Sequence, residues 1–108
     1  MTPADTLREA ARLMRQRAEP ATPGPWAEPV GSGDHGYVWS PCGHFQVALV
    51  DGNEDNNAKH IASWHPGLAL AVADWLDDAA DTIHEPGFIP GVTAVPALAV
   101  ARAYLGEA

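Results

Sequence analysis

The chain has 108 residues, of which 46% are hydrophobic and 19% are charged, and its formal net charge is −8. This length fits one domain, and the apolar fraction is too high for a disordered acidic chain. No apolar stretch reaches the roughly 20 residues that span a bilayer, and the six basic residues are too few to neutralise a nucleic-acid backbone. We therefore expect a soluble, cytoplasmic, single domain over residues 1–108, with neither a membrane nor a nucleic acid as its partner.

The first predicted element is a helix over residues 3–18. Thr2 and Pro3 suit an N-cap and a first helical position, and Asp5 places negative charge in the first turn. Apolar residues then recur at spacings of three and four as far as Ala18. Three arginines share the adjacent face: Arg8, Arg12 and Arg15. We interpret this face as a solvated flank, and the alternative is that it docks on an acidic partner or on the rest of the chain.

Short runs typical of strands follow a segment rich in proline and glycine. They cover Trp26–Val30, Gly36–Ser40 and His44–Val50. The turn chemistry between the runs favours a hairpin and, with the first run, a three-stranded antiparallel meander. Three helices are expected after the sheet, over about 58–64, 66–84 and 93–105. The sequence thus predicts an α+β fold with an N-terminal helix, a small three-stranded antiparallel sheet and C-terminal helices packed on one face.

The long helix expected over residues 66–84 divides into two faces. At about 100° per residue, one sector collects the apolar side chains of Leu68, Val72, Trp75, Leu76, Ala79 and Ile83. Another sector carries the carboxylates of Asp74, Asp77, Asp78, Asp81 and Glu85. We interpret the acidic sector as a solvated face. The alternative is an acidic mimic of nucleic acid that occupies the basic groove of a host enzyme and inhibits it.

Histidines and one cysteine raise the question of a metal or catalytic site. Cys42 and His44 lie two residues apart in the expected hairpin turn, and His60 and His65 are further candidate ligands. Their spacing does not match the common zinc motifs, and a nucleophilic cysteine needs a better placed base. We therefore assign no catalytic residue, no metal and no cofactor. A small-ligand or metal-dependent activity around His60, Trp64 and His65 stays as an alternative.

Two short motifs in a fixed order resemble a known family. The first is Thr22-Pro23-Gly24-Pro25-Trp26, and the second is Asn57-Ala58-Lys59-His60-Ile61-Ala62 followed by Pro66. Together they resemble small phage and prophage proteins of the lambdoid Ead/Ea early-region type and related actinobacterial and actinophage proteins of unknown function. The resemblance implies structural roles for the matching residues and brings no catalysis to transfer. The chain departs from it at Ser63-Trp64-His65, where small residues are frequent.

The sequence thus favours a non-enzymatic phage or prophage accessory protein that binds another protein. The acidic character predicts a basic partner, and a second copy of the chain is the other expected partner. The expected binding residues are Trp26, His60, Trp64, His65, Asp74, Asp77, Asp78 and Asp81. A tryptophan such as Trp64 is interpretable either as a core residue or as an interface anchor.

Overall fold

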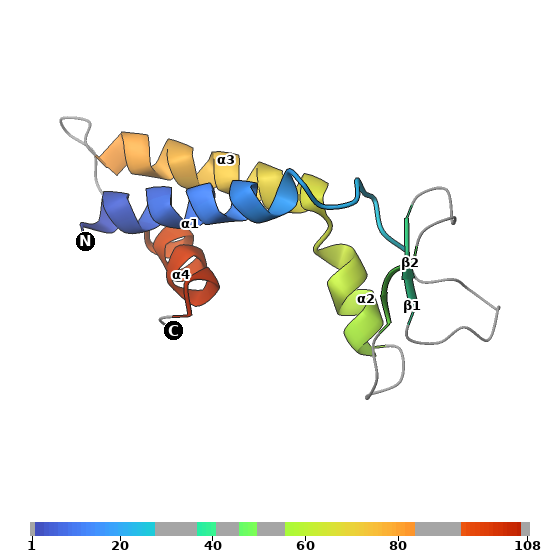
Figure 1. Ribbon diagram of the computed structural model, residues 1–108. Coiled ribbons are helices and arrows are strands. Elements are labelled where there is room, and N and C mark those ends of the chain that lie inside the picture. Colours follow the sequence, from blue (N-terminus) through green and yellow to red (C-terminus); the bar gives the residue numbers. More distant parts are fainter. Residues whose placement is uncertain (1, 28–36, 41–45, 50–55, 84–93, 107–108) are drawn as a thin grey trace. The chain divides into compact units, whose positions relative to one another are not determined.

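The computed structural model describes residues 2–27, 37–40, 46–49, 56–83 and 94–106 (Figure 1). The elements in these ranges are α1 (Pro3–Ala18), β1 (Tyr37–Trp39), β2 (Gln46–Leu49), α2 (Asn56–Ser63), α3 (Pro66–Ile83) and α4 (Ala94–Tyr104). The fold is α+β, as predicted, with helices dominating and a small antiparallel sheet. None of the helices in the described ranges is long and apolar enough to cross a membrane.

The chain divides into two compact units. The helical unit consists of residues 1–17 and 70–108, and the mixed unit consists of residues 18–69. The helical unit therefore takes its parts from both ends of the chain, whereas the mixed unit is continuous. The single folding domain expected from the chain length stays a prediction, because the compactness of a unit does not measure whether it unfolds by itself.

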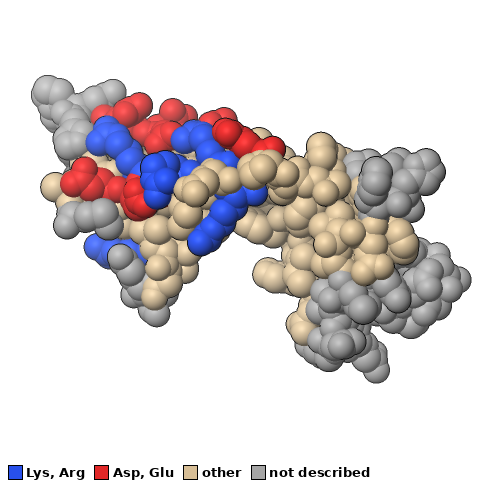
Figure 2. Space-filling model, in the orientation of Figure 1, with Lys and Arg blue, Asp and Glu red and all other residues tan. Residues whose placement is uncertain are grey.

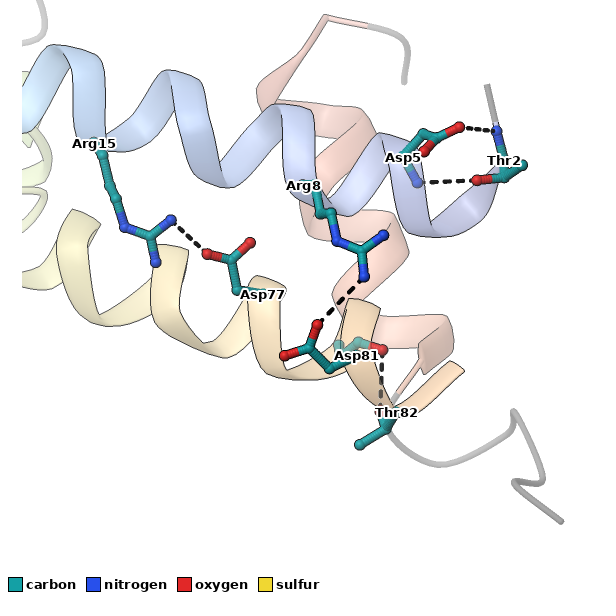
Figure 3. Close-up of polar contacts among 8 residues, drawn as sticks. Thr2, Asp5, Arg8, Arg15, Asp77, Asp81 and Thr82 are labelled. Atoms are coloured by element: carbon teal, nitrogen blue, oxygen red, sulfur yellow. Dashed lines mark hydrogen bonds and ion pairs between the residues drawn. The ribbon is translucent and has the colours of Figure 1, made fainter. Parts of the chain in front are cut away.

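Helix α1 has the predicted bounds, and its first turn is capped from both directions. The Asp5 backbone N–H donates to Thr2 Oγ1 at 3.1 Å, and the Thr2 backbone N–H donates to Asp5 Oδ2 at 3.2 Å (Figure 3). This reciprocal pair is a capping box, which satisfies donors that the helix itself leaves without partners. The backbone hydrogen bond from Thr2 is also the main reason that the pKa of Asp5 lies below its usual value.

The core of the helical unit is made largely of alanine. Its buried members are Ala4, Leu7, Ala10, Ala11, Met14, Ala73, Leu76, Ala79, Ala80, Ala97 and Ala101, contributed by α1, α3 and α4. Of the part of this core that the structure describes, the large fully buried side chains are Leu7, Met14 and Leu76. Because alanine has a single methyl group, helices with alanine at their contact faces approach closely.

The packed face of α3 agrees with the predicted one only in part. Leu76 and Ala79 are buried in the core, and Val72 and Ile83 pack against it. Leu68 and Trp75, expected on the packed face, are 39% and 37% exposed, whereas Ala73 and Ala80 are buried. At about 100° per residue, the buried sector is rotated by roughly 50° from the predicted sector. The prediction placed the bulkiest apolar side chains inside, but the alanines fit the close contact between the helices of this unit.

The sheet of the mixed unit is smaller than predicted. Strands β1 and β2 pair antiparallel, with an irregularity in register between Val38 and Trp39. The expected third strand contributes a single bridge, in which Ala27 and Trp39 exchange backbone hydrogen bonds of 3.0 and 2.8 Å. On the N-terminal side of Ala27, the next hydrogen-bonded position of such a ladder falls at Pro25, and proline has no N–H to donate. The three-stranded prediction is therefore wrong, since the described sheet has two strands.

Helix α2 packs on the sheet. Buried Ala58 and Ala62 of α2 meet buried Val38 of β1, and partly buried side chains of Trp26, Val47, Ala48 and Ile61 surround them. Among the described residues, the prediction that the C-terminal helices cover one sheet face thus holds for α2. The parts of α3 and α4 that lie in the helical unit pack with α1 instead.

Helix α2 also begins two residues before its expected start, at Asn56. Helix α4 ends close to its predicted end, where Gly106 adopts a positive φ of 80°. That left-handed conformation suits glycine after the last turn of a helix.

Candidate functional site

Three of the four predicted acidic site residues of α3 form ion pairs with α1. Arg15 donates to Asp74 at 2.8 Å and to Asp77 at 2.5 Å, and Arg8 donates to Asp81 at 3.3 Å. The pairs to Asp77 and Asp81 are drawn in Figure 3. Hydrogen bonds from Arg15 to Asp74 and then to Asp77 raise the pKa of the Arg15 guanidinium. The acidic face of α3 therefore binds the arginine face of α1 within one unit.

The other two arginines of α1 are also engaged within the helical unit. Arg12 donates to Glu9 at 2.6 and 3.0 Å, and the guanidinium of Arg17 lies 5.4 Å from the ring centre of Tyr104 on α4. Figure 2 shows basic and acidic side chains gathered together on this face of the molecule. Arg8 and Arg15 thus dock on the rest of the chain, whereas Arg12 is exposed and pairs within α1, as expected of a solvated flank.

Asp78, the fourth predicted acidic residue, differs from the others. It is exposed and has no ion-pair partner among the residues that the structure describes. Trp75 lies three residues before it on α3 and is 37% exposed, although the sequence predicts it in the packed face. An exposed indole beside an exposed carboxylate is thus a feature that the sequence prediction missed. The alanines at 69, 73 and 80, which define the packed face, are the signal that would have found it.

Trp26 and His65 occupy packing positions in the mixed unit. Trp26 is half-buried, packs against the α2–β1 core, and donates its indole N–H to the Thr22 carbonyl at 2.9 Å. A Cβ added to Gly24 would lie 2.9 Å from both Cβ and Nδ1 of His65. The first motif, at residues 22–26, therefore contacts the segment just before Pro66, through Gly24 and His65.

The His65 side chain packs directly against Gly24. Its Nδ1 is buried and has no hydrogen-bond partner among the described residues. A Cβ added to Gly67 would likewise lie 3.2 Å from Cε1 and Nδ1 of His65, so the ring packs close to both glycines. The position therefore favours a packing role for His65.

The remaining candidates for a ligand site do not converge in the described structure. His60 is exposed on α2, where its carbonyl accepts a hydrogen bond of 2.6 Å from Ser63 Oγ, and Trp64 is 37% exposed after the last turn of that helix. Cys42 and His44 lie outside the described residues. Within the described ranges, no three His, Cys, Asp or Glu side chains are grouped so that they would hold a metal ion.

Comparisons of the chain with protein-family models, with curated proteins and with solved structures give no match.

The two ion pairs of Arg15 supply a testable contribution to stability. In a double-mutant cycle with Arg15→Gln and Asp77→Asn, we expect a coupling energy of about 0.2–1 kcal/mol, the range for partly exposed pairs. In 1 M salt the coupling should shrink, because the Debye length falls to about 3 Å. Urea unfolding of the four proteins at low and high salt measures both quantities.

The matched control is the cycle of Arg15→Gln with Asp78→Asn. Asp78 lies one residue beyond Asp77 on α3 and makes no ion pair with Arg15. We expect no coupling in this cycle. Equal coupling at Asp77 and Asp78 would show that only the general charge of α3, and not the observed pairs, acts on Arg15.

Proposed function

We propose that the chain is a non-enzymatic protein-binding module, an accessory protein of the phage or prophage type that acts in the cytoplasm. The observation that carries the proposal is the exposure of one tryptophan in each unit, Trp64 in the mixed unit and Trp75 in the helical unit, both at 37%. Tryptophan is enriched among the residues that dominate binding energy at protein interfaces, because it offers a large rigid surface and a polar N–H.

The packing of the other candidates supports a binding role over catalysis. His65 and Trp26 are occupied in the contacts of the mixed unit, and His60 stands on the exposed side of α2. An acid–base or metal-dependent activity needs several such groups to converge on one point. The small-ligand alternative around His60, Trp64 and His65 accordingly has weaker support.

The nucleic-acid mimic has weaker support for a different reason. Asp74, Asp77 and Asp81 already bind arginines of α1, so a basic groove would compete with these internal ion pairs. Exchange of Asp77 and Asp81 for asparagine would disturb the packing of α1 on α3 as well as any mimicry. These two exchanges are therefore poor tests of the mimic.

Affinity capture tests the proposed binding function. The wild-type chain, Trp64→Ala and Trp75→Ala are immobilised in parallel, and proteins retained from a lysate of the native host are identified by mass spectrometry. We expect a protein that the wild type retains and that one tryptophan variant loses, and this protein is then purified and titrated against all three chains. Val95→Ala, at an exposed position of α4, is the control and should retain it.

Loss of affinity by a factor of ten or more in one tryptophan variant would support the proposal and would identify the unit that binds. Equal retention by the wild type and both tryptophan variants would contradict it. Circular dichroism of each variant establishes that the helices are intact before the comparison is made.

A further inference from the structure

The exposed surface of α3 in the helical unit carries a patch in which apolar side chains lie next to carboxylates. Ala71, Trp75 and Asp78 are exposed, and at about 100° per residue they fall in one sector roughly 60° wide. Asp74 flanks this sector, and 74% of its side-chain surface is exposed although its Oδ1 accepts a hydrogen bond from Arg15. We call Ala71, Asp74, Trp75 and Asp78 the α3 patch.

The α3 patch combines two groups that attract a cation. The face of an indole attracts Lys and Arg more strongly than other aromatic rings do, and a carboxylate three residues away is a neighbour on a helix surface. Arg15 pairs with Asp74 at the edge of the patch and with Asp77, and Arg8 pairs with Asp81, so neither arginine pairs with Asp78. The attraction of Trp75 and Asp78 for a cation is thus open to another molecule.

The charge of the whole chain decides between the two expected kinds of partner. Two copies of a chain with a formal net charge of −8 repel each other, and the patch itself would bring Asp78 of one copy towards the acidic α3 of the other. A segment with arginine or lysine beside apolar side chains complements both the negative charge and the apolar surface of the patch. We propose that the α3 patch binds such a cationic amphipathic segment of another protein, with an arginine or lysine on Trp75 and Asp78.

This inference rests on the proposed binding function and gives its partner a chemistry. The arginine contributes in two ways, by stacking on the indole and by pairing with the carboxylate. The aliphatic side chains of the segment cover Ala71 and the rest of the indole. Both kinds of contact are needed, so neither a purely apolar segment nor a highly charged one without apolar residues should bind well.

A set of synthetic peptides tests the inference without the natural partner. The probe is a 14-residue peptide with leucines at positions i, i+3, i+4 and i+7 and arginines on the flanks, and its analogues carry citrulline or glutamate in place of arginine. Citrulline keeps the shape of arginine and removes its charge. Isothermal titration gives the affinity, and the indole N–H signal of Trp75 in nitrogen-15 spectra, assigned with Trp75→Phe, gives the position.

We expect the arginine peptide to shift the Trp75 indole signal and to bind at least tenfold more tightly than the citrulline peptide. Asp78→Asn and Trp75→Leu should each weaken binding at least fivefold, since Trp75→Leu keeps an apolar side chain but removes the aromatic face. Glu19→Gln is the control for Asp78→Asn, because it removes one exposed carboxylate from the mixed unit. It should leave the affinity within twofold of the wild type.

Equal binding of the arginine and citrulline peptides would overturn the inference, as would equal weakening by Asp78→Asn and Glu19→Gln, which would indicate attraction to the net charge alone. The proposed function is tested separately by capture. If a captured protein depends on Trp64 and the arginine peptide leaves the Trp75 signal unchanged, the binding function stands and the cationic site on α3 is refuted.

Discussion

Leu76→Ala is expected to lower the free energy of unfolding by about 2–5 kcal/mol, the range for truncation of a buried leucine. Leu76 is fully buried in the core of the helical unit, and the other large fully buried side chains among the described residues of this unit are Leu7 and Met14. Its neighbours in the core are mainly alanines. An alanine has no rotamer that can move into a cavity, so only the larger, partly buried side chains around the core, such as Val72 and Leu98, can reduce the space left by the leucine.

Urea unfolding followed by circular dichroism at 222 nm measures this loss, because α1, α3 and α4 supply most of the helix in the described structure. The matched control is Val95→Ala, an exposed position of α4 that is 60% accessible. We expect it to change stability by no more than about 0.5 kcal/mol, as exposed substitutions do. A Leu76→Ala protein as stable as Val95→Ala would contradict the packing of α3 on α1 and α4.

The local signals of the sequence predict most of the helices. The cap formed by Thr2 and Asp5 and the apolar spacing that follows predict α1 with its observed bounds. A cap depends on residues three positions apart, so its geometry is contained in the local sequence. The same holds for the glycine that follows α4, since Gly106 adopts the left-handed conformation that ends a helix.

The face of a helix that packs is harder to predict than the helix itself. In α3, the prediction ranked side chains by hydrophobicity and placed Trp75 inside, whereas Ala73 and Ala80 are buried there. Which face packs depends on the surface of the partner helix, and α1 is about 60 residues away in the sequence. The contact face of α1 includes the small side chains of Ala4, Ala10 and Ala11, which pack in the same core as the alanines of α3.

The charge pattern shows the same limitation. The sequence reveals an arginine face on residues 3–18 and an acidic face on residues 66–84, and both are present in the structure. It does not show that Arg15 reaches Asp74 and Asp77, because that contact follows from how the apolar faces dock. Once α1 and α3 pack through their alanines, their charged flanks come together, and Asp78 is left on the outer side.

Gly24→Ala is the second substitution with a large expected effect, a loss of about 1–3 kcal/mol that is typical of an overpacked contact. Two effects oppose each other at this position. Alanine restricts the unfolded chain more than glycine does, which stabilises by about 0.4–1 kcal/mol where the backbone conformation suits it. The new Cβ would, however, lie 2.9 Å from Cβ and Nδ1 of His65. Because the Cβ of His65 is fixed to the backbone, it cannot move away as the end of a long side chain would, and the steric cost exceeds the gain.

Gly67→Ala is the control, because it presents a new methyl group to the same histidine from the other side. There the nearest atoms are Cε1 and Nδ1 of the His65 ring at 3.2 Å, so a small rotation of the ring relieves the contact. Gly67 is the second residue of α3, and alanine is favoured over glycine in helices because it loses less backbone entropy on folding. We expect Gly67→Ala to be neutral or stabilising. The two substitutions thus distinguish a clash with the fixed Cβ of His65 from a clash that rotation of the His65 ring can relieve.

A second substitution at His65 isolates the cause of the loss at Gly24. His65→Gly removes both the ring and the Cβ. Residue 65 is the N-cap of α3, because its carbonyl oxygen accepts hydrogen bonds from the backbone N–H groups of Leu68 and Ala69, and an N-cap position tolerates glycine. In that background Gly24→Ala should be neutral or stabilising by up to about 1 kcal/mol, and unfolding followed by tryptophan fluorescence measures the difference. The same loss in both backgrounds would mean that Gly24 is required by its own backbone. Rescue by His65→Gly would mean that Gly24 of the first motif is needed because His65, at the position where this chain departs from the family pattern, packs against it.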